Sequence, residues 1–289
     1  MKIKFPHLDI FSIGKETDKM ENIRKKLGAF AAAPHFVWTV LFIVAPLLFV
    51  IYYTFTDLDG GFTFENILAL KEHIGTFMLS ISLSVIATFI CFLVGYPLAY
   101  IIAKSKESSQ KIMIMLLMLP MWTNLLIRTY SMMAIMDDGG FLNTILGQLS
   151  LGKLHLIGTK GAVIFGMVYD FLPYMVLPIY TTISKLDTNL LEAAQDLGCN
   201  QFGVLSRVIL PLSASGIISG VTMVFVPSIS TFYISQKLGG GTFELIGDTI
   251  ERQFQNSSTY NVGAAISLVM MILVLVSLAI MNKFAEEEV

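Results

Sequence analysis

The stretch EAAQDLGCNQFGVLSRVILPLSASG, residues 192–216, is water-compatible and lies between two long apolar segments of the chain. Its apolar residues follow the period of a helix on both sides of Gly198. Glycine adopts the left-handed conformation that ends a helix at little cost, so Gly198 predicts a tight turn. The pattern therefore predicts a helical hairpin. Its apolar side either packs on the chain's own helices or is covered by a partner.

Capping residues and apolar positions define the two helices of the hairpin. Thr188 or Asn189 can cap the first helix, and Asn200 can cap the second. Pro211 ends the second helix or joins it to the next segment. The apolar face of the first helix is expected to hold Leu186, Leu190, Ala194 and Leu197. The apolar face of the second is expected to hold Phe202, Leu205, Ile209 and Leu212.

The chain as a whole is too apolar for a soluble domain. Of its 289 residues, 55% are hydrophobic and 14% are charged, whereas soluble domains carry about 25% charged residues. A helix that crosses a bilayer needs about 20 apolar residues. Six such stretches predict an all-α integral membrane protein with six transmembrane helices, at residues 36–55, 77–103, 112–136, 161–183, 214–235 and 262–282. In the fifth stretch, Gly216 and Gly220 favour close packing against another helix.

Lysine and arginine are unevenly divided between the two sets of connecting segments. Thirteen lie in the N-terminal segment, the second–third loop, the fourth–fifth loop and the C-terminus, and five lie in the other loops. Because positive residues concentrate on the cytoplasmic side, we expect both termini and the hairpin to lie in the cytoplasm. The predicted parts are a cytoplasmic segment (1–35), a six-helix domain (36–283) with the hairpin at about 186–212, and an acidic cytoplasmic tail (284–289).

The hairpin resembles the EAA loop of ABC-importer permeases, whose pattern is EAA-x3-G-x9-I-x-LP. Val208 stands where the pattern has isoleucine, and the other fixed positions agree. The resemblance implies a permease fold of the type I ABC importers, in which this loop sits in a groove of a cytoplasmic ATPase. The positions that it implies for coupling to the ATPase are Glu192, Ala193, Ala194, Gly198, Leu210 and Pro211.

Each of these positions has an implied role. Glu192 would offer its carboxylate to a basic group of the ATPase, and the two alanines would let the helix lie close in the groove. Gly198 would set the turn. Leu210 and Pro211 would fix the connection to the fifth transmembrane helix.

Longer strings resemble the spermidine/putrescine branch of these permeases. They are WTNLLIRTYSMMAIMDDGGFLN (122–143), YDFLPYMVLPIYTTISKLDTNLLEAAQDLG (169–198) and VPSISTFYISQKLGGGTFELIGDTIERQF (226–254). In the third string, Thr231 and Ser235 stand where an acidic or small residue and a proline are more usual. The likeness runs from about residue 36 to the end and implies a polyamine importer. Related branches carry iron or opines, so another small solute is the alternative cargo.

The resemblance also implies the partners. These are a cytoplasmic ABC ATPase dimer that binds ATP and magnesium, a second permease subunit expected to be a different chain, and an extracytoplasmic solute-binding protein. The expected location is the inner, cytoplasmic membrane. A net charge of −2 gives no basic field for nucleic acid.

Asp170 and Tyr169 are the first candidates for the substrate path. An acid inside a membrane should face protein or a water-filled cavity, and Asp170 is the only acid well inside a predicted span. It either contacts a cation in the path or pairs with Arg128, the only base inside a span. Both interactions occur, at different stages, if the ion pair between Asp170 and Arg128 opens during transport.

Aromatic residues and outer acids complete the candidates. Trp122, Tyr130 and Tyr233 either form a wall for a cation or simply pack or anchor at the interface. The acids of the outer loops either attract a cation, receive the delivering protein or are solvated. They are Asp137, Asp138, Glu244, Asp248 and Glu251.

The sequence predicts no enzymatic activity in this chain. The string at residues 147–153 matches most of the phosphate-binding loop G-x4-G-K-[ST], but Leu154 follows where a hydroxyl must bind the metal. We therefore expect no cofactor and no metal site. The rival functions are a stand-alone secondary transporter, which needs midplane acids in both halves and inverted repeats, and an assembly scaffold, which does not need Asp170.

Overall fold

The structure is a computed structural model that describes residues 33–149 and 152–286. The chain divides into two compact units, Met1–Tyr53 and Thr54–Val289. The described residues are helical, and their only β-type pairing is an isolated bridge between Thr56 and Phe62. The all-α prediction is therefore confirmed.

In the first unit the described residues belong to one apolar helix, Ala33–Thr54, which is long enough to cross a membrane. It contains a π-helical turn, η1 (Val40–Val44), followed by α2 (Ala45–Thr54). Pro46 lies at the second position of α2. Because proline has no N–H and clashes with the carbonyl four residues earlier, a widened turn directly before it is the expected adjustment. Most of the predicted N-terminal segment, residues 1–32, lies outside the described residues.

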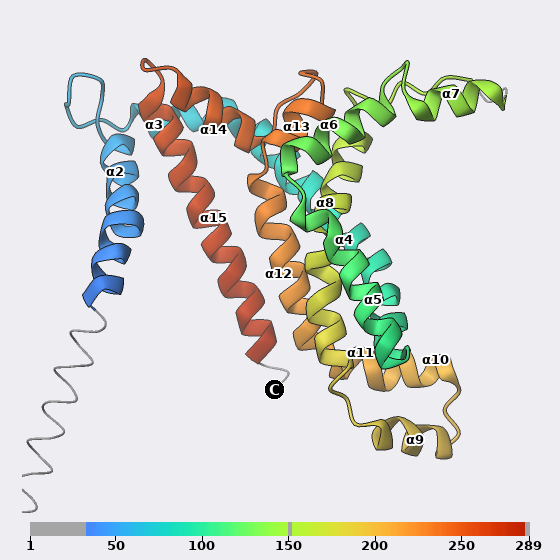
Figure 1. Cartoon of the computed structure of the whole chain (residues 1–289). Helices are drawn as coiled ribbons and strands as arrows, with labels where there is room; N and C mark the ends of the chain where they lie inside the picture. Colours follow the sequence, from blue (N-terminus) through green and yellow to red (C-terminus); the bar gives the residue numbers. More distant parts are fainter. Residues whose placement is uncertain (1–32, 150–151, 287–289) are drawn as a thin grey trace, which may run out of the picture. The chain divides into compact units, whose positions relative to one another are not determined.

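The second unit is a bundle of long helices with shorter helices at both ends (Figure 1). Its helices in chain order are α3 (Glu65–Leu68), η2 (Ala69–His73), α4 (Ile74–Lys104), α5 (Glu107–Met118), η3 (Leu119–Trp122), α6 (Leu125–Met136), α7 (Phe141–Gln148), α8 (Lys160–Ile183), α9 (Thr188–Asp196), α10 (Gln201–Val204), η4 (Leu205–Ile209), α11 (Leu210–Leu212), α12 (Ala214–Ser230), α13 (Tyr233–Leu238), α14 (Ile246–Gln255) and α15 (Tyr260–Glu286).

Four helices of the described residues are long and apolar enough to cross a membrane, and two bent pairs raise the number to six. The predicted third span, 112–136, is not one continuous helix. It is broken after Trp122, and the two parts meet at 94°. Pro120 lies in the 3₁₀ turn η3, Thr123 is extended, and Asn124 caps the next helix by accepting from the Leu126 amide at 2.7 Å. These signals together stop one helix and start another.

The predicted fifth span, 214–235, is also shorter than expected. Helix α12 ends at Ser230, Thr231 is extended, and α13 begins at Tyr233. At its other end α12 meets the helical segment Gln201–Leu212 at 67°, with Ser213 as the joint. Helix α15 continues to Glu286, into the predicted tail (284–289).

Helix α8 occupies the centre of the second unit and packs on both α4 and α12. The buried side chains between them include Met175, Val176 and Ile179, all fully buried. Gly216 and Gly220 of α12 lie so close to α8 that a Cβ atom on Gly220 would be 3.0 Å from the Met175 carbonyl oxygen. The close packing predicted from this glycine pair is confirmed.

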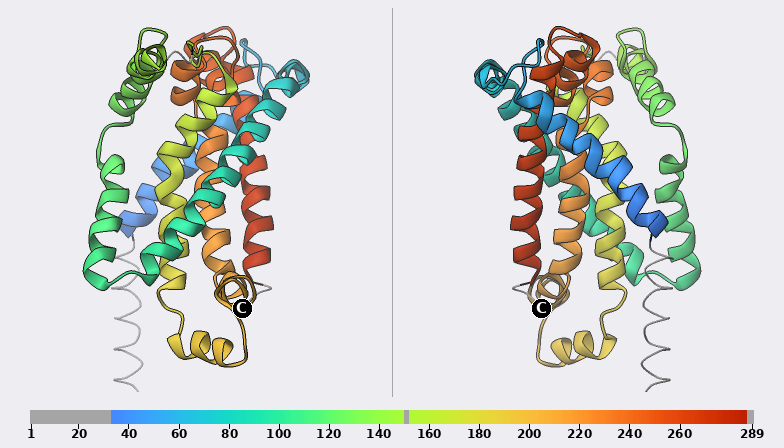
Figure 2. Two further views of the ribbon diagram at one scale, coloured as in Figure 1. Left: turned by 90° about the vertical axis from the view of Figure 1, so that its right-hand side faces the viewer. Right: turned by 90° about the vertical axis from the view of Figure 1, so that its left-hand side faces the viewer.

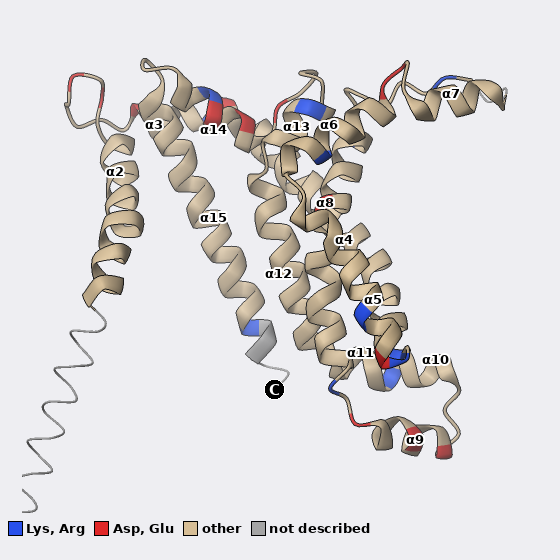
Figure 3. Ribbon diagram, viewed as in Figure 1, with Lys and Arg blue, Asp and Glu red and all other residues tan. Residues whose placement is uncertain are grey.

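Charged residues gather at the two ends of the second unit (Figure 3). The end that carries α9 and α10 also holds the C-terminal end of α15, whereas α13, α14 and α7 lie at the opposite end (Figure 2). This division agrees with the predicted membrane crossings. The direction of the chain in the membrane stays a prediction.

We predict that Gly216→Ala and Gly220→Ala each destabilise the protein by about 1–3 kcal/mol, because overpacking a close helix contact forces the backbones apart. An added Cβ would lie 2.9 Å from the Pro178 carbonyl oxygen at Gly216. The measurement is the melting temperature in detergent. Gly75→Ala is the matched control, since an added Cβ there meets no atom within 4 Å. Equal melting temperatures for all three variants would contradict the packing argument.

Candidate functional site

The hairpin at residues 186–212 forms as two helical segments with a tight turn between them. The cap of the first helix is Asp187, whose Oδ1 accepts from the Asn189 amide at 2.9 Å, and not Thr188 or Asn189 as predicted. Gly198 has φ of 88°, the conformation that its predicted turn requires. Asn200 caps the second segment as predicted, accepting from the Gly203 amide at 2.7 Å.

One side of the hairpin packs on the ends of α4 and α8. Leu191, Val204 and Ile209 are buried in the same cluster as Ile102 and Ile183. The predicted faces are therefore only partly right. On the first helix Leu190 and Leu197 are exposed and Leu191 is buried instead. On the second, Phe202 and Leu212 are exposed. Leu212 follows the π-helical turn η4, which rotates later residues away from the regular helical register.

The other side of the hairpin is open. Leu197 is 87% exposed and Phe202 is 75% exposed, beside the exposed residues Glu192 and Ala193. No basic side chain of the described residues pairs with Glu192. Ala194 is half-buried, and Leu210 and Pro211 are exposed before the joint at Ser213. The hairpin thus presents an unpaired carboxylate and two exposed apolar side chains.

The joint between the hairpin and α12 is fixed by a buried hydrogen bond. The Ser213 hydroxyl lies 3.0 Å from the Tyr96 hydroxyl of α4, and Ser213 is fully buried. Removing a partner from a buried hydrogen bond leaves a polar group unsatisfied, which costs free energy. The hairpin, α4 and α12 are therefore connected at one point as well as by apolar packing.

Asp170 and Arg128 form an ion pair. Arg128 Nη1 lies 3.0 Å from Asp170 Oδ1, and the two side chains are 13% and 2% exposed. Despite this distance, neither carboxylate oxygen of Asp170 has a partner with hydrogen-bond geometry among residues 33–149 and 152–286. The pair is therefore held by charge, and the carboxylate keeps unused acceptor positions. Of the two readings of Asp170, pairing with Arg128 is the one observed.

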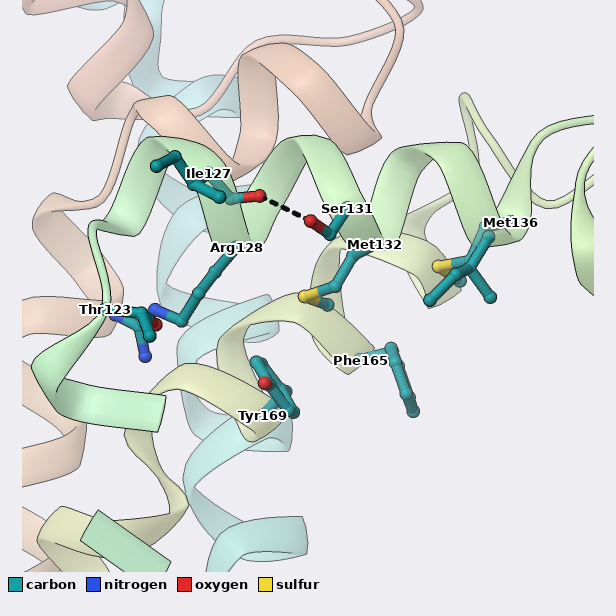
Figure 4. Close-up of a pocket in the computed structure, with 9 residues that line it drawn as sticks. Thr123, Ile127, Arg128, Ser131, Met132, Met136, Phe165 and Tyr169 are labelled. Carbon is teal, nitrogen blue, oxygen red and sulfur yellow. Dashed lines mark hydrogen bonds between the residues drawn. The ribbon is translucent and has the colours of Figure 1, made fainter. Parts of the chain in front are cut away.

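Arg128 also lines a cavity of about 370 Å³ beside α6 and α8 (Figure 4). The other lining residues include Thr123, Ser131, Met132 and Tyr169, and Tyr169 is 40% exposed. Ser131 donates to the Ile127 carbonyl oxygen at 2.8 Å and so is already bonded. The structure thus brings three predicted path residues together: Tyr169 and Arg128 at the cavity and Asp170 behind Arg128. Trp122 is 74% exposed on η3 and does not line the cavity.

Tyr233 belongs to a second cluster that sequence reasoning described only in part. Tyr130 of α6 and Tyr233 of α13 are edge to face, with ring centroids 6.3 Å apart. Lys237, four residues after Tyr233, places its ammonium 5.3 Å from the Tyr130 centroid and 5.7 Å from that of Tyr233. In the sequence analysis Lys237 is only one of the five basic residues assigned to the other loops. The available signal was the four-residue spacing, which places Tyr233 and Lys237 on one helix face.

The outer acids differ from one another in their surroundings. Asp248 is 5% exposed and accepts from the Leu245 amide at 2.7 Å and the Ser235 hydroxyl at 2.9 Å. Burial raises the pKa of Asp248 to about 6, although these two hydrogen bonds lower it. Asp248 therefore caps α14 and is not a solvated loop acid.

Three more of the outer acids have side-chain partners, and the fifth, Asp137, is exposed. Glu244 pairs with Arg252 at 2.9 Å, and Glu251 accepts from Gln236 and Gln255. Asp138 lies 2.8 Å from His155 Nδ1. Each of these three acids is already engaged within the chain. No group of three or more possible metal-binding side chains occurs in the part of the chain that the structure describes.

Residues 28–287 match the family described as "Binding-protein-dependent transport system inner membrane component". The chain belongs to this family. It is 38% identical over 259 residues to the spermidine/putrescine transport system permease protein PotB of Haemophilus influenzae, covering 86% of this chain and 91% of the relative. It is 37% identical to PotB of Escherichia coli, covering 81% and 89% of the two chains. The protein is thus a membrane transport component and not itself an enzyme.

Solved structures show the same fold at low sequence identity. A bacterial ABC transporter involved in the import of the acidic polysaccharide alginate has a chain with a TM-score of 0.78 and 16% identity, covering 93% of this chain and 99% of that one. A chain of the MetNI methionine ABC transporter has a TM-score of 0.54 and 13% identity, covering 75% and 95%. The prediction of an ABC-importer permease fold is confirmed.

We predict that Asp170→Asn lowers stability by about 3–5 kcal/mol, because it leaves the Arg128 guanidinium buried without a counter-charge. The double variant Arg128→Gln/Asp170→Asn should regain much of this loss, since neither charge remains. The measurement is a double-mutant cycle on the melting temperature of the purified protein. Asp138→Asn, which breaks an exposed pair, is the control and should change little. Additive effects of the two single changes would show that the pair does not couple.

Proposed function

We propose that this chain is the membrane-spanning permease subunit of an ATP-driven importer of polyamines. It would form half of a translocation path, with a second and different permease subunit completing the path. The observation that supports polyamines as the cargo is the 37–38% identity to spermidine/putrescine permeases over more than 80% of the chain. The two solved importer structures, with 13–16% identity, support the fold and not the cargo.

We infer that the exposed side of the hairpin receives a cytoplasmic ATPase dimer. Its support is the unpaired Glu192 on the same hairpin as the exposed Leu197 and Phe202, apolar surface that a soluble partner would cover. The uneven distribution of lysine and arginine supports a cytoplasmic position for this surface and for both termini. ATP and magnesium would bind to the partner ATPase, and a solute-binding protein would deliver the cargo at the opposite end.

The cargo path would use Asp170 and the aromatic residues near it. A polycation that leaves water needs carboxylates and aromatic faces in place of its hydration shell. Asp170 has both oxygens without a hydrogen-bond partner among the described residues, so it could accept from an ammonium when Arg128 moves away. Tyr169 and Arg128 line the neighbouring cavity, and Trp122 stands at the break before α6. Opening of the ion pair would then be one step of transport.

The cargo is tested by uptake into proteoliposomes that hold the complete complex with its binding protein and ATP. We expect accumulation of labelled spermidine and putrescine that stops when ATP is replaced by a non-hydrolysable analogue. Radiolabelled iron and an opine serve as competing cargoes. Uptake of either of these, with no uptake of polyamine, would overturn the cargo assignment while keeping the permease role.

The coupling surface is tested by Glu192→Lys. We expect this change to reduce co-purification of the ATPase and to abolish ATP-driven uptake. The new lysine would repel the basic group of the ATPase that the Glu192 carboxylate is expected to face. Glu107→Lys is the matched control. It makes the same change of charge at the start of α5, next to the end of α4 that packs on the hairpin, where the exposed Glu107 pairs with the exposed Lys111. Normal uptake by Glu192→Lys would exclude Glu192 from coupling.

A further inference from the structure

The ammonium of Lys237 lies between two tyrosine rings. It is 5.3 Å from the Tyr130 centroid and 5.7 Å from the Tyr233 centroid, and the rings are inclined at 80°. Both distances are within the roughly 6 Å at which an ammonium is attracted to the face of an aromatic ring. The two rings come from different helices, α6 and α13, so the arrangement depends on tertiary packing. It forms two walls of a cage around one cation.

No carboxylate among the described residues forms an ion pair with Lys237. The acids on α14 and just before it are engaged elsewhere: Glu244 by Arg252, Asp248 by Ser235 and Glu251 by Gln236. Lys237 is half-buried, so its charge is not fully hydrated. The two tyrosines are therefore its observed partners, through their rings and through the Tyr130 hydroxyl.

The chemistry of the bound group identifies a ligand class. The lysine side chain is an ammonium on a chain of four methylene groups, which is an n-butylammonium ion. Putrescine and spermidine each end in an aminobutyl group of the same length and charge. A cage that holds the end of Lys237 is therefore suited to the aminobutyl end of a polyamine.

We propose that Tyr130 and Tyr233 form an alkylammonium-binding site, and that Lys237 fills it in this conformation as an internal substitute for the cargo. The ligand assignment rests on the proposed polyamine transport, but the site itself does not. For cargo to bind, Lys237 must leave the cage.

The site and the cavity described above share the helix α6. Arg128 lines the cavity, whereas Tyr130, two residues later, points from a different face of the helix and does not line it. The Nη1 atom of Arg128 lies 3.0 Å from Asp170 Oδ1. Two groups that could bind a cation, the Asp170 carboxylate and the pair of tyrosine rings, therefore each hold a basic side chain of this protein. A shift of α6 would change both contacts, because Arg128 and Tyr130 belong to the same helix.

The first test is binding, which does not depend on which cargo is transported. The probe is n-butylammonium, measured by saturation-transfer NMR on the complete complex in nanodiscs. Lys237→Met removes the internal cation and keeps most of the side-chain length, so we expect about three- to tenfold tighter binding than in the wild type. Lys237→Arg keeps a cation and should bind the probe as the wild type does. Adding Tyr130→Leu to Lys237→Met should abolish the gain.

A second variant guards against misfolding. Lys237→Gln also removes the charge, and it should show the same gain if Lys237→Met does not assemble. Tyr233→Phe in the Lys237→Met background keeps the ring and should keep the gain, whereas Tyr233→Leu should lose it. Unchanged binding in both uncharged Lys237 variants, or a gain that survives loss of both rings, would overturn the proposal.

Uptake separates this proposal from the proposed function. If the wild-type complex imports putrescine, the KM for putrescine should fall about three- to tenfold in Lys237→Met and stay unchanged in Lys237→Arg. If the wild type imports no polyamine but Lys237→Met still binds n-butylammonium more tightly, the site stands and the cargo assignment fails. If putrescine is imported with the same KM by all Lys237 variants, the cargo assignment stands and the site fails.

Discussion

The close approach of α12 to α8 is the constraint on which the rest of the second unit depends. Gly216 and Gly220 leave no room for a Cβ atom between the two helices, and Gly95 of α4 lies equally close to Met175 from the other side. Close-packed contacts of this kind transmit a displacement and do not absorb it. Because α12 is joined to the hairpin at Ser213 and α8 carries Asp170, a movement of the hairpin would be passed toward the ion pair through packed backbone.

Much of the fold could be predicted from the sequence, because the bilayer permits few solutions. A span without water must satisfy its backbone hydrogen bonds internally, so long apolar segments predict helices. The breaks were harder to predict. Pro120, Thr123 and Asn124 each carry a local signal, but Pro97, Pro173 and Pro178 lie inside helices that continue. Whether a proline ends a helix depends on neighbouring helices, which the sequence does not show.

The candidate site was predicted less completely, for a similar reason. The sequence identified Asp170 and Arg128 as unusual charges and left their pairing open, because two residues 42 positions apart meet only through the packing of α6 on α8. The hairpin turn followed from Gly198 alone, whereas the buried faces were partly wrong. On the first helix Leu191 and not Leu190 is buried, which depends on how that helix docks on α4 and α8, and beyond η4 the helical register changes. Lys237 was missed because its partner Tyr130 lies on another helix. Local chemistry was thus predictable, and contacts between helices were not.

A tethered cation also sets a condition on the cargo. A group attached by a short linker acts at an effective concentration on the order of millimolar, so a free monoamine at micromolar concentration cannot displace Lys237 through the tyrosine contacts alone. A polyamine carries further ammonium groups, which can engage additional acceptors outside the two rings. Exchange of one ammonium for another between the same rings costs little, because the interaction lost equals the one gained. The additional contacts then determine which cation binds. Competition with Lys237 would therefore make the site selective for polycations over simple amines, with no need for a residue that contacts the far end of the ligand.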